Sequence, residues 1–262
     1  THPTAIVFQR PWEKRLMKAE IINIKGSHLL KAFRHLFIVK YCGLRPLSFH
    51  SRWRNMTQVY LIRHATTDWM EREILHGTSD RPLSEFGLQQ AHATADFLKG
   101  IHFDRLYTSP LLRAKQTAEK ISQVANIEPI EVDDLKEEYY GVLEGRRDWW
   151  LRVKTKPVLI PLHTSSRVVI SALTGEPIWA FRRRVERAWE AIKAENPSGT
   201  IGVVAHSGVL RCILRHELGG SHLNKKFILS ACSVSQIEVD GHKHARLVML
   251  NQNDHLPGNN SL

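Results

Sequence analysis

The sequence has few cysteines and no long apolar segment. Its 262 residues include only Cys42, Cys212 and Cys232, which form no C-x-x-C pair and leave one cysteine over. This odd, scattered set suits a reducing compartment better than a disulfide framework, so we expect a cytoplasmic protein. Lys, Arg or His interrupts the longest apolar runs well short of the roughly 20 residues that a membrane helix needs. We therefore predict no transmembrane segment.

Two catalytic signatures are also absent. The residue six positions after each cysteine is Ser48, Leu218 or Glu238 rather than arginine, which excludes the C-x₅-R site of cysteine phosphatases. No glycine is followed directly by lysine, so there is no P-loop and no case for a nucleotide-driven kinase or ATPase. The chain also has no low-complexity tract and no repeat of the solenoid or propeller kind. Its length fits a single globular enzyme.

The net charge of +11 is concentrated near the start of the chain. Residues 1–55 carry 11 Lys and Arg against two acids, a net charge of +9, whereas the other residues hold 26 bases against 24 acids. Because Met56 directly precedes the first strand signal, we interpret 1–55 as a basic N-terminal extension outside a folded domain at 56–262. Residues 29–37 have the spacing of a basic amphipathic helix, which is either a targeting or membrane-surface sequence or part of an extension without a function. We expect no nucleic-acid partner.

From Met56 onward, strand and helix signals alternate along the chain. Apolar runs and the turns around them predict strands at 59–62, 103–107, 201–205, 233–239 and 245–250. Helical spacing and end signals predict helices at 84–98, from an N-cap at Ser109 with Pro110 as first helical residue through 124, at 181–194, and from Ser207 to Gly219. The predicted fold class is therefore α/β, a three-layer αβα sandwich with a mostly parallel central sheet.

Polar residues follow three of the predicted strands. Arg63 and His64 come after the first strand, Ser109 and then Arg113 after the second, and His206 after the third. In open α/β sheets, ligands bind beyond the carboxyl ends of the strands. A cation such as Arg113 in a first helical turn opposes the positive end of the helix dipole, and a bound anion or a surface carboxylate would compensate it. Each histidine alone has a structural alternative, but the recurrence at equivalent strand ends indicates an anion site.

Five motifs, in order, resemble those of the histidine phosphatase superfamily, also called phosphoglycerate mutase-like. They lie at residues 61–69 (LIRHATTDW), 77–91 (GTSDRPLSEFGLQQA), 107–118 (YTSPLLRAKQTA), 135–145 (LKEEYYGVLEG) and 203–209 (VVAHSGV). Nothing upstream of Met56 takes part. Two positions depart from the family pattern: Ala65 replaces the glycine after the nucleophile, and Met70 replaces an asparagine that in the family commonly contacts the phosphate.

The resemblance implies a role for each site residue. His64 is the nucleophile that becomes phosphohistidine, His206 is a second catalytic histidine, and Glu137 is the general acid and base. The implied phosphate-binding residues are Arg63, Arg113, His206 and Thr67. With three of these residues, Arg63, Arg113 and His206, expected as cations around the phosphoryl group, we expect a metal-independent site that uses no cofactor.

The resemblance also implies the activity, a phosphoric monoester hydrolase of the histidine acid type. Basic residues and tryptophans gather at 146–174, which we interpret as a candidate cap that favours a small acidic phosphorylated metabolite; a solvated connection is the alternative. Two other functions stay open. Residues 137–141 (EEYYG) are similar to the E-R-H-Y-G of phosphoglycerate mutases, while Met70 and the basic extension suggest a catalytically weak binding protein of the same fold. The sequence leaves the oligomeric state open.

Overall fold

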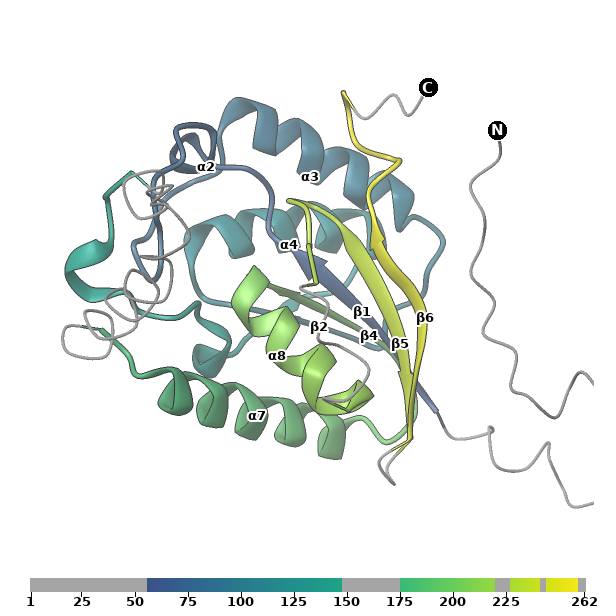
Figure 1. Cartoon of the computed structure of the whole chain (residues 1–262). Helices are drawn as coiled ribbons and strands as arrows, with labels where there is room; N and C mark the ends of the chain where they lie inside the picture. Colours follow the sequence, from purple (N-terminus) through teal and green to yellow (C-terminus); the bar gives the residue numbers. More distant parts are fainter. Residues whose placement is uncertain (1–55, 148–174, 220–226, 241–243, 259–262) are drawn as a thin grey trace, which may run out of the picture. The chain divides into compact units, whose positions relative to one another are not determined.

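The apolar run that follows Met56 forms a strand near the middle of a six-stranded sheet. The computed structural model describes residues 56–147, 175–219, 227–240 and 244–258 (Figure 1). The basic extension at 1–55, with its predicted helix, and residues 148–174 of the candidate cap lie outside the described residues.

Four parallel strands make up most of the sheet. They are β1 (Thr57–Arg63), β2 (Arg105–Thr108), β3 (Pro129–Glu131) and β4 (Gly199–Ala205). β5 (Val234–Val239) runs antiparallel to β1, and β6 (Ala245–Gln252) runs antiparallel to β5. The strand order is β3-β2-β4-β1-β5-β6. The sheet is therefore mostly parallel, as predicted, with its antiparallel pairings gathered at one edge.

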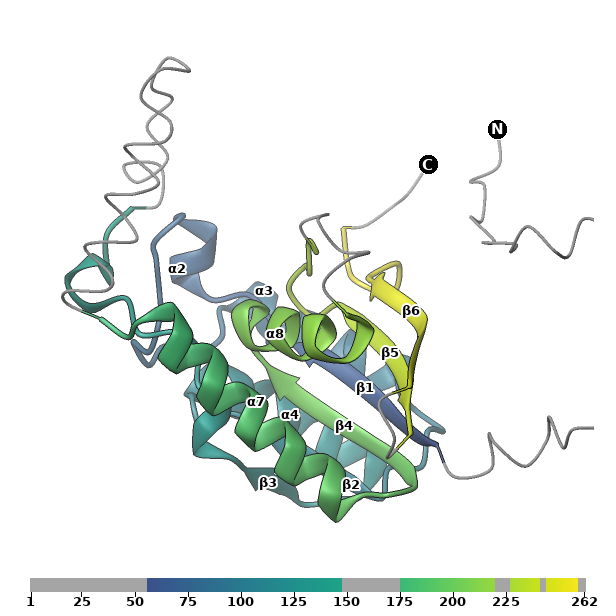
Figure 2. The ribbon, with the colours of Figure 1, turned by 60° about the horizontal axis from the view of Figure 1, so that its bottom comes forward.

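Helices cover both faces of the sheet (Figure 2). α3 (Glu85–Phe97) and α4 (Leu112–Ala125) pack on one face, and α7 (Ile178–Glu195) and α8 (Ser207–Leu218) pack on the other. Successive side chains of a strand point to opposite faces. Val203 of β4 accordingly joins the core under α7 and α8, whereas Val204 joins the core under α3 and α4. These two cores confirm the three-layer αβα sandwich.

Short elements that the sequence did not predict connect the strands to the helices. They are α2 (Asp68–Glu71), the 3-10 helices η2 (Asp133–Leu135) and η3 (Gly141–Leu143), and the three-residue strand β3. Each is too short to show a full period of apolar residues, so no pattern in the sequence marks it.

The start of α4 differs from the prediction. The helix begins at Leu112 with Leu111 as its N-cap, so the assignment of Ser109 as N-cap and Pro110 as first helical residue is wrong. The Ser109 hydroxyl instead accepts the N–H of Leu111 at 3.3 Å. The N–H of Leu112 donates to Asp80 Oδ1 at 2.6 Å, so a carboxylate distant in sequence satisfies the helix end.

α7 is the longest described helix and begins earlier than predicted. It starts at Ile178, directly after Pro177, rather than at Phe181, and spans 18 residues. Its exposed face carries charged residues. Within the described ranges, no helix is both long enough and apolar enough to span a membrane.

Candidate active site

Neighbouring strand ends bring the predicted polar residues together. Arg63 ends β1, and His64 follows it. Ser109 follows β2, and His206 follows β4. Because β2, β4 and β1 are adjacent and parallel, these residues lie together at the carboxyl ends of the three strands. The ring centroids of His64 and His206 are 5.0 Å apart, so the two predicted catalytic histidines are direct neighbours.

The ring of His64 is buried and has a defined orientation. Its Nδ1 atom lies 2.7 Å from the carbonyl oxygen of Ala65. A carbonyl only accepts, so Nδ1 carries the proton and Nε2 has a free lone pair. Burial, followed by the charges of Arg113 and Arg63, lowers the pKa of His64 well below its ordinary value of 6.5. The imidazole is therefore neutral at pH 7, which is the state that the predicted nucleophile role requires.

His206 is fully buried and is held by Ser109. Its Nε2 atom lies 2.8 Å from Ser109 Oγ. Its Nδ1 atom is buried and has no hydrogen-bond partner among the described residues. Burial, followed by the charge of Arg113, lowers the pKa of His206 well below 6.5. This ring is also neutral at pH 7, with one nitrogen left for a ligand.

Arg63 and Arg113 each use part of their guanidinium group on backbone carbonyls. Arg63 Nη1 donates to the carbonyl of Leu229 at 2.6 Å. Arg113 donates from Nη1 to Ser79 at 2.9 Å and from Nη2 to Gly77 at 2.7 Å. The Nε atoms of both arginines are buried without a partner in the part of the chain that the structure describes. Burial lowers the pKa of Arg113 to about 10, which still leaves it charged at pH 7.

Glu144 fixes the loop that holds Arg113. Its Oε1 accepts the N–H of Thr78 at 2.8 Å, and its Oε2 accepts the N–H and hydroxyl of Ser79 at 2.9 and 2.6 Å. Gly77 adopts a φ of 57°, and a Cβ there would collide with the Glu144 carboxylate. The loop therefore needs glycine at this position, and Glu144 acts on the site through the carbonyls that Arg113 contacts.

Side chains of the motifs also hold the backbone after His64. The N–H of Ala65 donates to Thr117 Oγ1 at 3.1 Å, and the N–H of Thr66 donates to Gln90 Oε1 at 3.1 Å. Thr117 and Gln90 are buried and belong to α4 and α3. These contacts hold the backbone that follows His64, the predicted nucleophile, in place.

Thr67 is engaged by a histidine that the sequence analysis did not single out. Thr67 Oγ1 lies 2.6 Å from His76 Nε2 and accepts the N–H of Met70 at 3.2 Å as the N-cap of α2. Burial, followed by the charge of Arg113, lowers the pKa of His76 to about 4. Only its position next to Gly77, at the start of a motif, marks His76 in the sequence.

Glu137 lies beside the first turn of α8. Its side chain is buried, with Oε2 accepting the N–H of Gly208 at 3.0 Å and Oε1 accepting the N–H of Glu138 at 3.1 Å. A Cβ at position 208 would collide with this carboxylate. Burial lowers the pKa values of Arg63 and Arg113, and Glu137 is the strongest of the charges that oppose this shift. The predicted acid thus shares the site with the predicted cations.

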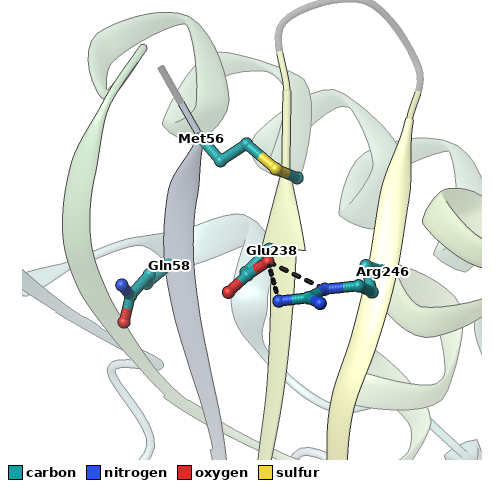
Figure 3. Close-up of a pocket in the computed structure, with 4 residues that line it drawn as sticks. All are labelled: Met56, Gln58, Glu238 and Arg246. Carbon is teal, nitrogen blue, oxygen red and sulfur yellow. Dashed lines mark hydrogen bonds and ion pairs between the residues drawn. The ribbon is translucent and has the colours of Figure 1, made fainter. Parts of the chain in front are cut away.

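A second feature of the sheet lies at its other end. A pocket near the start of β1 is lined by Met56, Gln58, Glu238 and Arg246 (Figure 3). Arg246 donates to Glu238 Oε2 from Nε at 2.9 Å and lies 2.7 Å from it through Nη2. This cation is already paired, and the pocket holds none of the predicted site residues.

Comparison with known proteins identifies a family that matches most of this chain. Residues 59–253 match the family described as "Histidine phosphatase superfamily (branch 1)". The "Uncharacterized phosphatase PhoE" of Bacillus subtilis is 32% identical over 204 residues, covering 78% of this chain and 98% of that protein. The "Probable phosphoglycerate mutase GpmB" of Yersinia pestis is 30% identical over 196 residues, covering 70% and 85%.

A solved structure shows the same fold. The phosphoserine phosphatase of Entamoeba histolytica, in complex with 3-phosphoglyceric acid, has a TM-score of 0.63 at 27% identity and covers 76% of this chain and 99% of its own. The fold and its relatives define an enzyme of the class that contains phosphatases and phosphoglycerate mutases. The chain belongs to the histidine phosphatase superfamily.

Proposed function

We propose that this protein is a metal-independent phosphomonoester hydrolase of the histidine acid type that works through a phosphohistidine on His64. One observation carries the proposal. Three buried nitrogens around His64 have no partner among the described residues: Arg63 Nε, Arg113 Nε and His206 Nδ1. Buried polar groups without partners are rare in native proteins. The oxygens of a phosphate would supply the missing acceptors.

In the first step, His64 Nε2 attacks the phosphorus in line with the ester oxygen. The N–P bond forms as the P–O bond to the alcohol breaks, and protonated Glu137 donates its proton to the leaving oxygen. Arg63, Arg113 and His206 hold the equatorial oxygens, with Thr67 as a further contact. A cation about 4 Å from a phosphate charge contributes roughly 4 kcal/mol at an effective dielectric near 20, so the two arginines can stabilise the transferred group, while neutral His206 donates a hydrogen bond from Nδ1.

In the second step, water attacks the phosphohistidine. Ionised Glu137 takes a proton from the water as the new P–O bond forms and the N–P bond breaks, which returns neutral His64 and inorganic phosphate. The depressed pKa of His64 supports this cycle, because the free imidazole does not become protonated near pH 7.

The substrate proposed is a small acidic phosphorylated metabolite. A relative of this chain is a phosphoserine phosphatase that binds 3-phosphoglyceric acid. Arg146 and Arg147, where the candidate cap begins, are exposed and add positive charge. A phosphoglycerate mutase is the second candidate, supported by the relative that carries this name and by residues 137–141.

The test uses the full chain in the presence of EDTA. Purified protein is incubated with a panel of phosphomonoesters, and phosphate release is measured; 3-phosphoglycerate with a trace of 2,3-bisphosphoglycerate is assayed for 2-phosphoglycerate in parallel. Hydrolysis should exceed isomerisation. Formation of 2-phosphoglycerate much faster than any phosphate release would make the protein a mutase. If no ester is turned over, the result would favour the third alternative, a catalytically weak binding protein of the same fold.

A further inference from the structure

All the N–H donors of the Arg184 guanidinium make hydrogen bonds to groups near Glu137. Arg184 lies on α7, its side chain is 16% exposed, and its guanidinium pairs in two places with the carboxylate of Glu176. Nε donates to Oε1 at 2.7 Å, and Nη2 donates to Oε2 at 2.8 Å. The remaining bonds go to the carbonyls of Asp134 at 2.8 Å, Lys136 at 2.7 Å and Glu137 at 2.9 Å.

These three carbonyls belong to the turn that carries the general acid. η2 ends at Leu135, and the chain then passes through Lys136 to Glu137. On its other side, the Glu137 carboxylate meets the N–H of Gly208 at 3.0 Å. Arg184 therefore holds the backbone of the turn, while the N–H of Gly208 in the first turn of α8 holds the Glu137 carboxylate.

The guanidinium has the geometry for this task. Its planar fork makes several directed bonds at once, which a lysine ammonium on a flexible stem does not reproduce. Glu176 also balances its charge, so that Arg184 adds no unpaired positive charge beside the acid. The backbone of Glu176 is itself fixed, because its N–H donates to the carbonyl of Tyr139 at 2.7 Å.

We infer that the Arg184–Glu176 pair is a positioning device for the general acid, which sets the distance from the Glu137 carboxyl group to the leaving oxygen. Neither residue belongs to the predicted phosphate-binding set, and the donors of Arg184 are used by protein groups. This inference rests on the acid role of Glu137 in the proposed function. A displacement of about 1 Å at a reacting group can cost on the order of 10²-fold in rate. Because the pair holds the turn that carries Glu137, we expect its loss to slow proton donation by Glu137.

The test compares two esters in the full chain. An alkyl phosphate needs its leaving oxygen protonated, whereas 4-nitrophenyl phosphate does not. Arg184→Lys should lower kcat/KM by about ten- to a hundredfold for the alkyl ester and by less than about threefold for the aryl ester. Because kcat/KM covers only the steps up to phosphorylation of His64, the base role of Glu137 in the second step does not enter this comparison. In a Glu137→Gln background, the same change should cost less than about twofold, because the acid is already absent.

Arg187→Met is the matched control. Arg187 lies one turn further along α7 and contacts Asp134 through the carboxylate at 3.0 Å, with its side chain 65% exposed. Arg187→Met should leave kcat/KM for both esters unchanged. Glu176→Gln, which removes the charge partner and keeps the arginine, should repeat the selective loss and replaces Arg184→Lys if thermal unfolding shows that variant to be misfolded.

The outcomes separate the inference from the proposal beneath it. If Glu137→Gln lowers kcat/KM only for the alkyl ester but the Arg184 and Glu176 variants lower kcat/KM equally for both esters, the positioning role is wrong and the acid role stands. An undiminished effect of Arg184→Lys in the Glu137→Gln background has the same meaning. If Glu137→Gln itself lowers kcat/KM of both esters equally, the acid role fails and the inference fails with it.

Discussion

His64 Nδ1 and the carbonyl oxygen of the next residue, Ala65, lie 2.7 Å apart. This contact assigns the ring proton to Nδ1 and the lone pair to Nε2. We predict that His64 in the free protein at pH 7 is neutral and protonated on Nδ1. Side-chain ¹H–¹⁵N NMR, with His64→Gln to assign the signal, measures the tautomer. A His64 signal with the proton on Nε2, or a doubly protonated ring, would contradict this geometry.

Ser109→Ala should impair the site through His206. The hydroxyl lies 2.8 Å from His206 Nε2 and already accepts the N–H of Leu111, so its own proton is available to Nε2. That arrangement leaves the proton of His206 on Nδ1, where the partner is missing. Loss of the hydroxyl leaves a buried nitrogen unsatisfied and should reduce kcat/KM by about ten- to a hundredfold. Ser207→Ala, next to the same histidine, is the control, and equal activities of the two variants would argue against this role.

Glu144→Gln should weaken phosphate binding. An amide places N–H donors against the donors of Thr78 and Ser79, so the loop whose carbonyls hold Arg113 loses its anchor. The inhibition constant of inorganic phosphate should rise roughly tenfold, since a contact to a charged group contributes about 1.5–3 kcal/mol. The measurement is product inhibition. A folded variant with unchanged phosphate inhibition would show that the loop does not control Arg113.

Stability should fall as the pH drops below about 6.5. His64, His76 and His206 have lowered pKa values in the folded protein, with His76 at about 4, so the unfolded chain binds protons first. Each such histidine costs about 1.4 kcal/mol per pH unit below its unfolded value, until the folded pKa is reached. Thermal unfolding between pH 7 and 5 measures this slope. His76→Gln should make it shallower, and an identical slope would show that His76 is not buried in its neutral form.

Much of this site is readable from the sequence because its residues directly follow apolar strands. Arg63 ends β1 and His64 follows it, and His206 follows β4. The carboxyl ends of neighbouring parallel strands lie side by side, so these residues must come together. The same reasoning gives the fold class, since long apolar runs and long amphipathic helices have clear periods. The family motifs add Glu137 and Thr67, which no local pattern singles out.

The supporting contacts are not readable in this way because they join residues distant in the chain. Ser109 and His206 are 97 residues apart, and Glu144 and Ser79 are 65 apart. Ser109 before a proline has the local pattern of an N-cap, and only the packing of β2 beside β4 directs its hydroxyl to His206 instead. The sequence shows Arg184 only as a charged residue on a helix. Its contacts with the turn before Glu137 are 47 to 50 residues distant in the chain and appear only in the folded structure.

Trapping the phosphoenzyme shows whether phosphoryl transfer passes through His64. Wild type and His64→Ala are mixed with a ³²P-labelled phosphomonoester, quenched in denaturant within the first turnovers, and the protein-bound label is followed in acid and in base. We predict that the wild type carries label that is lost in acid and kept in base, with the phosphorus on Nε2, and that His64→Ala carries none. Label that survives acid but is lost in base, or label retained by His64→Ala, would contradict the account.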